Sequence, residues 1–269
     1  MELHPATLWE AISDVVPDRP ALVQGQTRRT WRQFDERASR LAGAFSAHGV
    51  GADAKVGLLL YNCPEFLESY FAALKVRAVP FNVNYRYTGE ELAYLLTNAD
   101  AQALVYHSSL AGAVEQAIAT TGPFRLMLEV PDGGTHIERS LPYEDVIART
   151  EPAPRIARDA DDVTMIYTGG TTGLPKGVVS KVGPPLAYLL DTVPPLMGHA
   201  PVPIAEMPQF TASLDGTDDI MVSLPAPPLM HNTGLGIGAL PALATGGTVV
   251  LLPTRRFDPS ELWDTVETE

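Results

Sequence analysis

The run Val163-Thr164-Met165-Ile166-Tyr167 leads directly into Thr168-Gly169-Gly170-Thr171-Thr172-Gly173-Leu174-Pro175-Lys176-Gly177. The apolar run predicts a buried β-strand. Three glycines within six positions allow a tight turn and a close approach to a ligand. Threonine hydroxyls and backbone N–H groups suit phosphate oxygens, and Lys176 adds a positive charge. Because open α/β sheets bind ligands at the carboxyl ends of parallel strands, this loop predicts a phosphate site.

Two other interpretations of the glycines are weaker. The loop is not a Walker sequence, which requires Gly-Lys followed by Ser or Thr, because Pro175 precedes Lys176 and Gly177 follows it. A second pattern, Gly234-Leu235-Gly236-Ile237-Gly238-Ala239, satisfies the dinucleotide-binding sequence. It follows no clean strand, and Leu252-Pro253-Thr254 stands where an acidic residue is needed. We interpret these glycines as positions where a helix packs closely against its neighbours. The alternative is a nicotinamide-binding site, which would make the protein an oxidoreductase.

Strand-like and helix-like stretches alternate on the N-terminal side of the loop. A hairpin is expected over 21–30, and helices follow the capping pairs Thr30/Gln33 and Thr88/Glu91 and the first-turn Pro64. Buried-strand patterns lie at 56–60, 79–83, 103–106 and 125–129. The alternation predicts an α/β fold of layered, largely parallel β-sheets flanked by helices.

A polar segment, 151–162, suggests a division of the chain. Residues 1–150 would form a first α/β subdomain, and 151–269 the phosphate-loop region and the start of a second one. The proline-rich stretch 182–228 gives no clear prediction. A helix is expected after His231, a strand over 248–252, and a last helix in which Asp258 is the cap and Glu261 completes a capping box. That helix reaches Glu269 without a stop signal, which predicts a cut within a longer protein.

Composition narrows the classes of partner. The net charge of −13 argues against nucleic acid and anionic membranes, but not against ATP or CoA, which need only a local patch of donors. The single cysteine, Cys63, excludes a disulfide framework and a Cys-rich zinc site and fits a reducing cytoplasm. No apolar run is long enough to cross a bilayer, and no leader opens the chain. We therefore expect a cytoplasmic protein without an integral membrane segment.

Four segments resemble, in order, the signatures of the adenylate-forming superfamily of acyl-CoA synthetases and AMP-dependent ligases. The 168–177 loop is similar to the variant found in bacterial fatty-acyl-CoA ligases. Thr30-Trp31-Arg32-Gln33-Phe34 resembles the family's early threonine-aromatic helix start, and 74–80 with Asn82 and Asn84 its second signature. Pro228-Leu229-Met230-His231 resembles its Pro-Leu-aromatic-His segment. Arg77 stands where the family usually has glycine, and Met230 where it has an aromatic residue.

The resemblance implies ATP-dependent activation of a carboxylic acid, fatty or otherwise apolar, to an acyl-adenylate and then an acyl-CoA. It implies ATP with Mg²⁺, and CoA as co-substrate. His231 and Asn232 would line the acid pocket, although a histidine satisfied in the core is the alternative for His231. Thr172 would lie near the Mg²⁺. The β- and γ-phosphates would be held by Thr168, Gly169, Gly170, Thr171, Thr172, Gly173 and Lys176.

The rest of the family's machinery is expected beyond Glu269. This includes the aromatic-Gly-x-Thr-Glu segment, the ribose-binding aspartate, the hinge and the C-terminal domain with its catalytic lysine. We therefore expect the chain alone to be inactive, with no catalytic residue among 1–269. Two alternatives remain: an amino- or aryl-acid-activating branch that loads a carrier protein, and a non-catalytic truncated paralogue. The sequence predicts neither the identity of the acid nor the oligomeric state.

Overall fold

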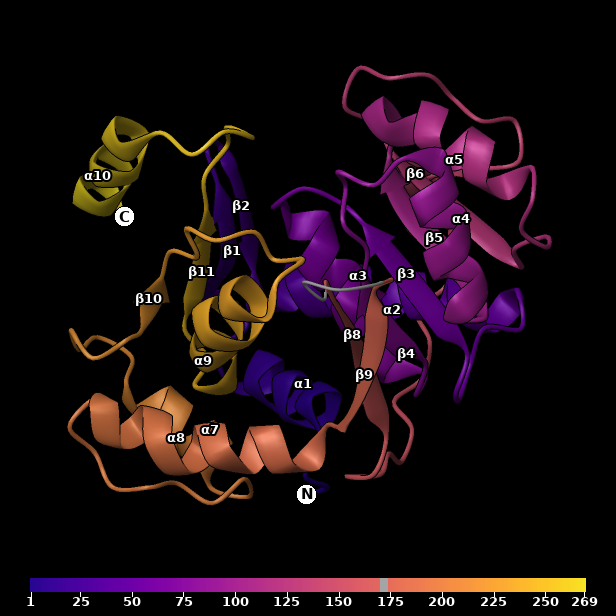
Figure 1. Ribbon diagram of the computed structural model, residues 1–269. Coiled ribbons are helices and arrows are strands. Elements are labelled where there is room, and N and C mark those ends of the chain that lie inside the picture. The colour runs from indigo at the N-terminus through magenta and orange to yellow at the C-terminus, as the bar shows by residue number, and fades with distance from the viewer. Residues whose placement is uncertain (170–173) are drawn as a thin grey trace.

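The computed structural model describes residues 1–169 and 174–269, in which two β-sheets lie with helices between and around them (Figure 1). The larger sheet has seven strands in the order β7-β6-β5-β3-β4-β8-β9, and its pairs are parallel except β8 with β9. This confirms the predicted α/β class. The strands are β3 (Lys55–Leu59), β4 (Val79–Asn82), β5 (Ala101–His107), β6 (Leu126–Val130), β7 (Leu141–Pro142), β8 (Val163–Thr168) and β9 (Lys176–Lys181).

The smaller sheet joins parts of the chain that are far apart in sequence. Its order is β10 (Val222–Ser223), β11 (Thr248–Leu251), β1 (Pro20–Gln24) and β2 (Thr27–Thr30). β1 and β2 form the predicted antiparallel hairpin, and β1 pairs in parallel with β11. Each sheet takes strands from both sides of residue 150, so the sheets do not follow the division into 1–150 and 151–269 that the polar segment suggested.

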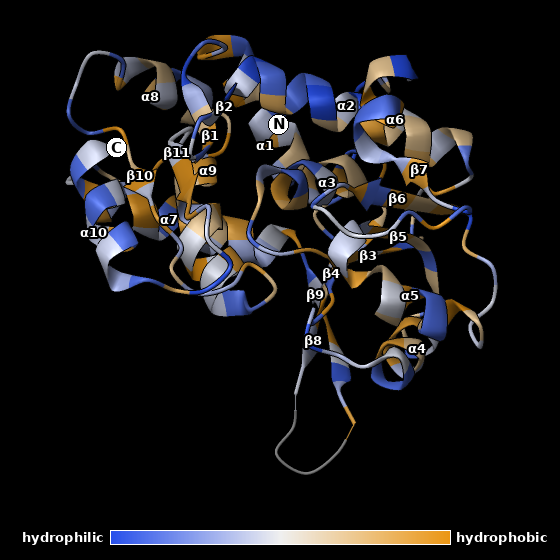
Figure 2. Ribbon diagram, turned by 90° about the horizontal axis from the view of Figure 1, so that it is seen from above, coloured by the Kyte–Doolittle hydropathy of each residue, from blue (hydrophilic) through white to orange (hydrophobic). Residues whose placement is uncertain are grey.

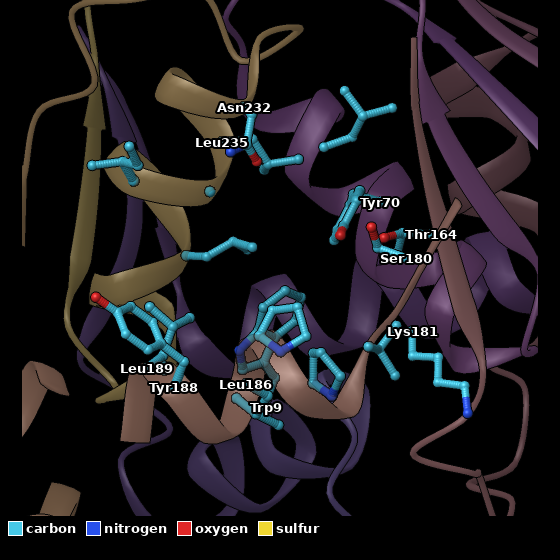
Figure 3. Close-up of a pocket in the computed structure, with 18 residues that line it drawn as sticks. Trp9, Tyr70, Thr164, Ser180, Lys181, Leu186, Tyr188, Leu189, Asn232 and Leu235 are labelled. Carbon is cyan, nitrogen blue, oxygen red and sulfur yellow. The ribbon is translucent and has the colours of Figure 1, made fainter. Parts of the chain in front are cut away.

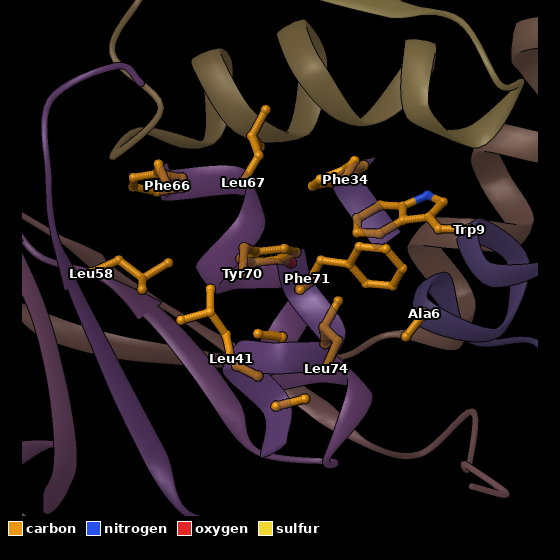
Figure 4. Packing of buried hydrophobic residues seen from close by; sticks show 14 of the residues in the cluster. Ala6, Trp9, Phe34, Leu41, Leu58, Phe66, Leu67, Tyr70, Phe71 and Leu74 are labelled. Carbon is orange, nitrogen blue, oxygen red and sulfur yellow. The ribbon is translucent and has the colours of Figure 1, made fainter. Parts of the chain in front are cut away.

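Three helices, α1, α2 and α3, pack against one another in the middle of the molecule. Of these, α3 contacts β1 of the smaller sheet and β3 and β4 of the larger one. Between these helices, Trp9, Phe34 and Phe71 form an aromatic cluster (Figure 4), one residue from each helix. The Trp9 and Phe71 rings are 5.1 Å apart and edge to face. Two further helices, α4 and α5, cover the other side of the larger sheet. The helices of this half are α1 (Pro5–Val15), α2 (Trp31–Ala47), α3 (Pro64–Lys75), α4 (Gly89–Asn98), η1 (Ser108–Leu110), α5 (Ala111–Ile118) and α6 (Tyr143–Arg149).

Local predictions in this half are confirmed at the level of single hydrogen bonds. The Thr30 hydroxyl accepts from Gln33 N at 3.3 Å while Gln33 Oε1 accepts from Thr30 N at 3.0 Å, which closes the first capping box. Thr88 and Glu91 close the second in the same way. Arg77 has φ 61°, the left-handed conformation that explains the glycine usual in similar sequences. Its guanidinium is held by the Asp162 carboxylate at 2.6 Å.

The proline-rich stretch contains two helices that the sequence did not predict, α7 (Gly183–Leu196) and α8 (Met207–Ser213). Pro184 and Pro185 lie in the first turn of α7, where no intrahelical donor is needed. Pro194 cannot donate to the carbonyl of Leu190, and Val202 N bonds that oxygen instead at 3.4 Å. The prolines therefore shape the ends of this helix and do not prevent it.

The C-terminal part continues through η2 (Thr233–Ala239), a π-helix, then α9 (Leu240–Ala244), β11 and α10 (Pro259–Thr268). Asp258 caps α10 through Ser260 N at 2.8 Å, as predicted. The capping box is wrong, because the Glu261 carboxylate accepts from the Thr254 hydroxyl. No residue of α10 is buried, and the helix lies at the upper left of the molecule in Figure 1. Its end is tied to β2 by Arg28, which donates to the Glu269 carboxylate at 2.6 Å.

Candidate nucleotide and acid site

The two arms of the glycine-rich loop form an antiparallel ribbon. β8 ends at Thr168, β9 begins at Lys176, and these two residues are paired. Thr168, Gly169 and Lys176 are exposed, and the ribbon projects from the edge of the larger sheet (Figure 2). The loop thus follows the carboxyl end of a strand parallel to β4, as predicted, but continues into a strand that was not predicted. Gly170, Thr171, Thr172 and Gly173 lie outside the described residues.

The base of the ribbon is held by polar side chains of neighbouring elements. Tyr167 N donates to Asn82 Oδ1 at 2.8 Å, and the Tyr167 hydroxyl donates to Asn98 Oδ1 on α4 at 2.7 Å. On the other arm, the Tyr94 hydroxyl of α4 donates to the Pro175 carbonyl at 3.4 Å. These bonds fix the points at which the chain enters and leaves the loop.

His231 and Asn232 lie close to this base. Both are exposed, and the backbone of His231 forms a turn, in which His231 N donates to Pro228 O and His231 O accepts from Leu235 N, each at 3.0 Å. The alternative of a core histidine is therefore wrong. Asn82 Nδ2 donates to the carbonyl of Met230, so one side chain contacts both the phosphate-loop strand and the histidine segment.

An apolar cavity of about 410 Å³ opens beside Asn232 (Figure 3). A hollow of about 20 Å³ under His231 and Asn82 adjoins it, and Tyr70, Thr164, Ile166, Asn232 and Leu235 line both. Burial raises the pKa of Tyr70 to about 12, so its hydroxyl is neutral at physiological pH. The cavity is of the size that holds small-molecule ligands. Its walls come from α1, α3, β8, β9, α7, η2 and α9.

The second glycine pattern forms one wall of this cavity. It lies in the π-helix η2, a rare geometry that is found often at functional sites. A side chain at Gly238 would lie 2.8 Å from Pro225 Cβ, and Gly234 packs against the Pro228 carbonyl. These glycines pack closely within a helix, as the sequence indicated, and do not form a strand-to-helix turn around a dinucleotide.

A second, polar cavity of about 470 Å³ lies where the carboxyl ends of strands from both sheets meet. Arg255 Cζ lies 4.3 Å from the centre of the Tyr61 ring, and the Tyr61 and Tyr85 rings are 4.6 Å apart. Arg86 and Arg256 also line the cavity. Sequence reasoning missed this site because its residues come from six separated segments. The available signal was the polar and aromatic pairs that follow strands, such as Tyr61-Asn62 and Tyr85-Arg86.

Within residues 1–169 and 174–269, no group of three or more His, Cys, Asp and Glu side chains is placed to hold a metal ion. None of the described helices has the length and apolar character needed to cross a membrane.

The two-sheet α/β fold with a glycine- and threonine-rich loop at a strand end defines a nucleotide-binding class of protein. The chain belongs to the AMP-binding enzyme family, whose sequence model matches residues 9–269. It is 34% identical to the medium-chain acyl-CoA ligase Mig of Mycobacterium avium, over 97% of this chain and 50% of that protein. It is 32% identical to the 3-oxocholest-4-en-26-oate–CoA ligase of Rhodococcus rhodochrous, over 99% and 48%.

Solved structures agree on the fold. A putative long-chain-fatty-acid CoA ligase from Rhodopseudomonas palustris superimposes with a TM-score of 0.79 at 25% identity, over 98% of this chain and 60% of that one. A benzoate CoA ligase from Burkholderia xenovorans gives 0.78 at 21% identity, over 98% and 48%. The chain spans about half the length of the curated relatives it matches.

Proposed function

We propose that this chain provides the phosphate-loop and acid-binding part of an ATP-dependent acid–CoA ligase that activates an apolar carboxylic acid. One observation carries the proposal: Asn82 joins the base of the phosphate loop to the His231 segment, and an apolar cavity opens beside them. A nucleotide and an acid bound there would meet at the carboxyl end of β8. Two relatives are named as ligases of a medium-chain acid and of a steroid acid, which supports an apolar acid as the substrate.

Each side chain has a proposed role. Thr168, Gly169, Gly170, Thr171, Thr172, Gly173 and Lys176 would hold the β- and γ-phosphates, because hydroxyls, backbone N–H groups and an ammonium suit phosphate oxygens. Asn232 of the apolar cavity and His231 of the adjoining hollow, both exposed, would bind the carboxylate. Positioning and charge neutralisation are most of what attack on the α-phosphorus requires.

Mg²⁺ would enter this site with the nucleotide. We assign the Thr172 hydroxyl of the loop as a protein ligand of this ion. Magnesium usually keeps several waters and binds substrate phosphates, so a single hydroxyl from the loop fits its coordination.

The polar cavity favours CoA over a carrier protein as the acyl acceptor. CoA carries phosphates and an adenine, and the cavity combines Arg86, Arg255 and Arg256 with the rings of Tyr61 and Tyr85. A carrier protein would need an extended docking surface instead. We place the activity in the cytoplasm, since the single Cys63 suits a reducing compartment.

Filling the apolar cavity tests the proposed acid site. Ser180→Trp on β9 places an indole in the cavity, whereas Val179→Trp places it on the opposite face of the same strand. We expect Ser180→Trp to weaken decanoate binding at least ~10-fold, a loss of about 1.4 kcal/mol, as measured by calorimetry. Val179→Trp should bind decanoate like the wild type. Equal affinities in all three chains would refute the assignment of the cavity.

A second expectation concerns catalysis by residues 1–269 alone. We expect no steady formation of decanoyl-CoA from decanoate, MgATP and CoA, because no residue of this chain is assigned the role of the catalytic lysine. Product can be followed by chromatography, with a full-length acyl-CoA ligase as positive control. Continuous CoA-ester formation by the pure chain would show that its own residues complete the reaction.

A further inference from the structure

We propose that Asn82 is a positioning residue that couples the phosphate loop to the acid-binding segment. This inference rests on the proposed function, since it concerns the same two substrate sites. Asn82 closes β4, and its side chain is buried, with 9% of the residue exposed. It reaches the two segments through the last backbone groups before Thr168 and His231.

All three polar groups of the Asn82 amide are in use. Oδ1 accepts from Tyr167 N at 2.8 Å, and Nδ2 donates to Tyr167 O at 3.4 Å and to Met230 O. A backbone N–H can only donate, so Tyr167 N fixes which end of the amide faces β8. The two amide protons then point to the two carbonyls.

The Asn82 side chain bonds the backbone of Tyr167 where the described pairing between β4 and β8 ends. Among the described residues β4 pairs with β8 at Phe81 and Met165, and Asn82 serves Tyr167 beyond that point. Tyr167 and Met230 are both buried, so their carbonyls need donors from within the protein. One residue further along the chain, Thr168 and His231 are exposed. A shift of Asn82 therefore moves the start of both binding segments together.

Asn82→Asp separates this role from packing. Aspartate has nearly the same shape and still accepts from Tyr167 N, but its second oxygen faces two carbonyls in place of two N–H donors. Burial and these carbonyls raise the pKa of such a carboxyl, and its protonated form regains one donor. Among the described residues, the titratable groups that line the hollow are Tyr70 from α3 and His231, and Tyr167 of β8 bonds Asn82 directly. The wild-type protein at each pH is therefore the necessary reference.

The experiment measures decanoate and MgATP affinities of residues 1–269 by calorimetry at pH 7.5 and 6.0. We expect Asn82→Asp to weaken both ligands at least ~10-fold at pH 7.5 and to recover part of that loss at pH 6.0, beyond any change in the wild type. The matched control is Asn84→Asp, which keeps its acceptor for Arg86 N and bonds neither Tyr167 nor Met230. This control should leave decanoate affinity unchanged.

Loss of only one ligand, or unchanged affinities in folded Asn82→Asp, would overturn the coupling. If Asn82→Asp does not fold, Asn82→Ser, which keeps one donor and one acceptor, should weaken both ligands without recovery at pH 6.0. If the wild type binds neither ligand, the proposed function fails for this chain, and backbone NMR decides the positioning. Joint shifts of the Thr168 and His231 amide signals in the variant then support it, and a shift confined to one of them refutes it.

Discussion

Glu10→Gln is expected to lower the free energy of unfolding of the chain by about 3–5 kcal/mol, the usual result of breaking a buried ion pair. Glu10 Oε1 lies 2.7 Å from Lys75 Nζ, and both of its oxygens accept from Arg158 at 2.8 Å. All three residues are at most 5% exposed. Glutamine keeps the shape of the side chain but leaves two buried cations short of a counter-charge.

The ionisation of Glu10 agrees with this account. Burial alone would raise its pKa, but the hydrogen bonds from Arg158 and Lys75 hold the pKa below its usual value. The cluster joins α1, the end of α3 and the 151–162 segment, so its loss loosens the support behind the larger sheet. Arg158 Nε also donates to the carbonyl of Lys75 at 3.2 Å, which fixes the segment on the helix end.

Asp14→Asn is the matched control, one helical turn further along α1. Asp14 pairs with Arg155 at 2.6 Å, but its side chain is 56% exposed. Such surface pairs contribute roughly 0–1 kcal/mol, so this variant should unfold close to the wild type in urea. A Glu10→Gln midpoint indistinguishable from that of Asp14→Asn, at equal m-value, would show that the buried cluster contributes little.

The second large effect is a loss of stability between about pH 6.5 and pH 4. Burial, together with Arg158, lowers the pKa of His4 from 6.5 to about 4 and outweighs the opposing Asp162. Burial, together with Arg255, lowers that of His107 by the same amount against Asp132. In this window the unfolded chain binds protons that the folded chain does not, so stability falls as the pH falls. Each histidine accounts for up to about 3 kcal/mol.

Replacement of both histidines should reduce the loss. His4 Nδ1 accepts from Ala6 N at 3.2 Å and His107 Nδ1 from Tyr61 N at 3.2 Å, so asparagine offers an acceptor at each position without titrating. We expect the thermal midpoint of His4→Asn/His107→Asn to change less than that of the wild type from pH 7.5 to pH 4.5. Parallel curves over this range would overturn the assignment to the two histidines, because carboxylates such as Asp132 and Asp162, whose pKa values are depressed, lose their contribution only at lower pH.

The candidate site was only partly predictable. The glycine-rich loop and His231 stood out because their residue types carry chemistry within one short segment. Asn82 was noted as part of a signature, but its role depends on Tyr167 and Met230, which come close to it only in the folded chain. The cavities were not predictable, because the walls of the apolar cavity come from seven elements spread from Pro5 to Ala244.

The sequence by itself determined the α/β class, both capping boxes of the first half, the β1–β2 hairpin and the strand before the phosphate loop. These features depend on propensity, periodicity and hydrogen bonds between residues a few positions apart. The tertiary structure decided that β1 pairs with β11 and that β9 folds back along β8. It also decided that the proline-rich segment forms the helix α7, with prolines in its first and last turns. Such pairings depend on which sheet edge and which apolar surface are free once the other elements have packed, and no local pattern encodes that.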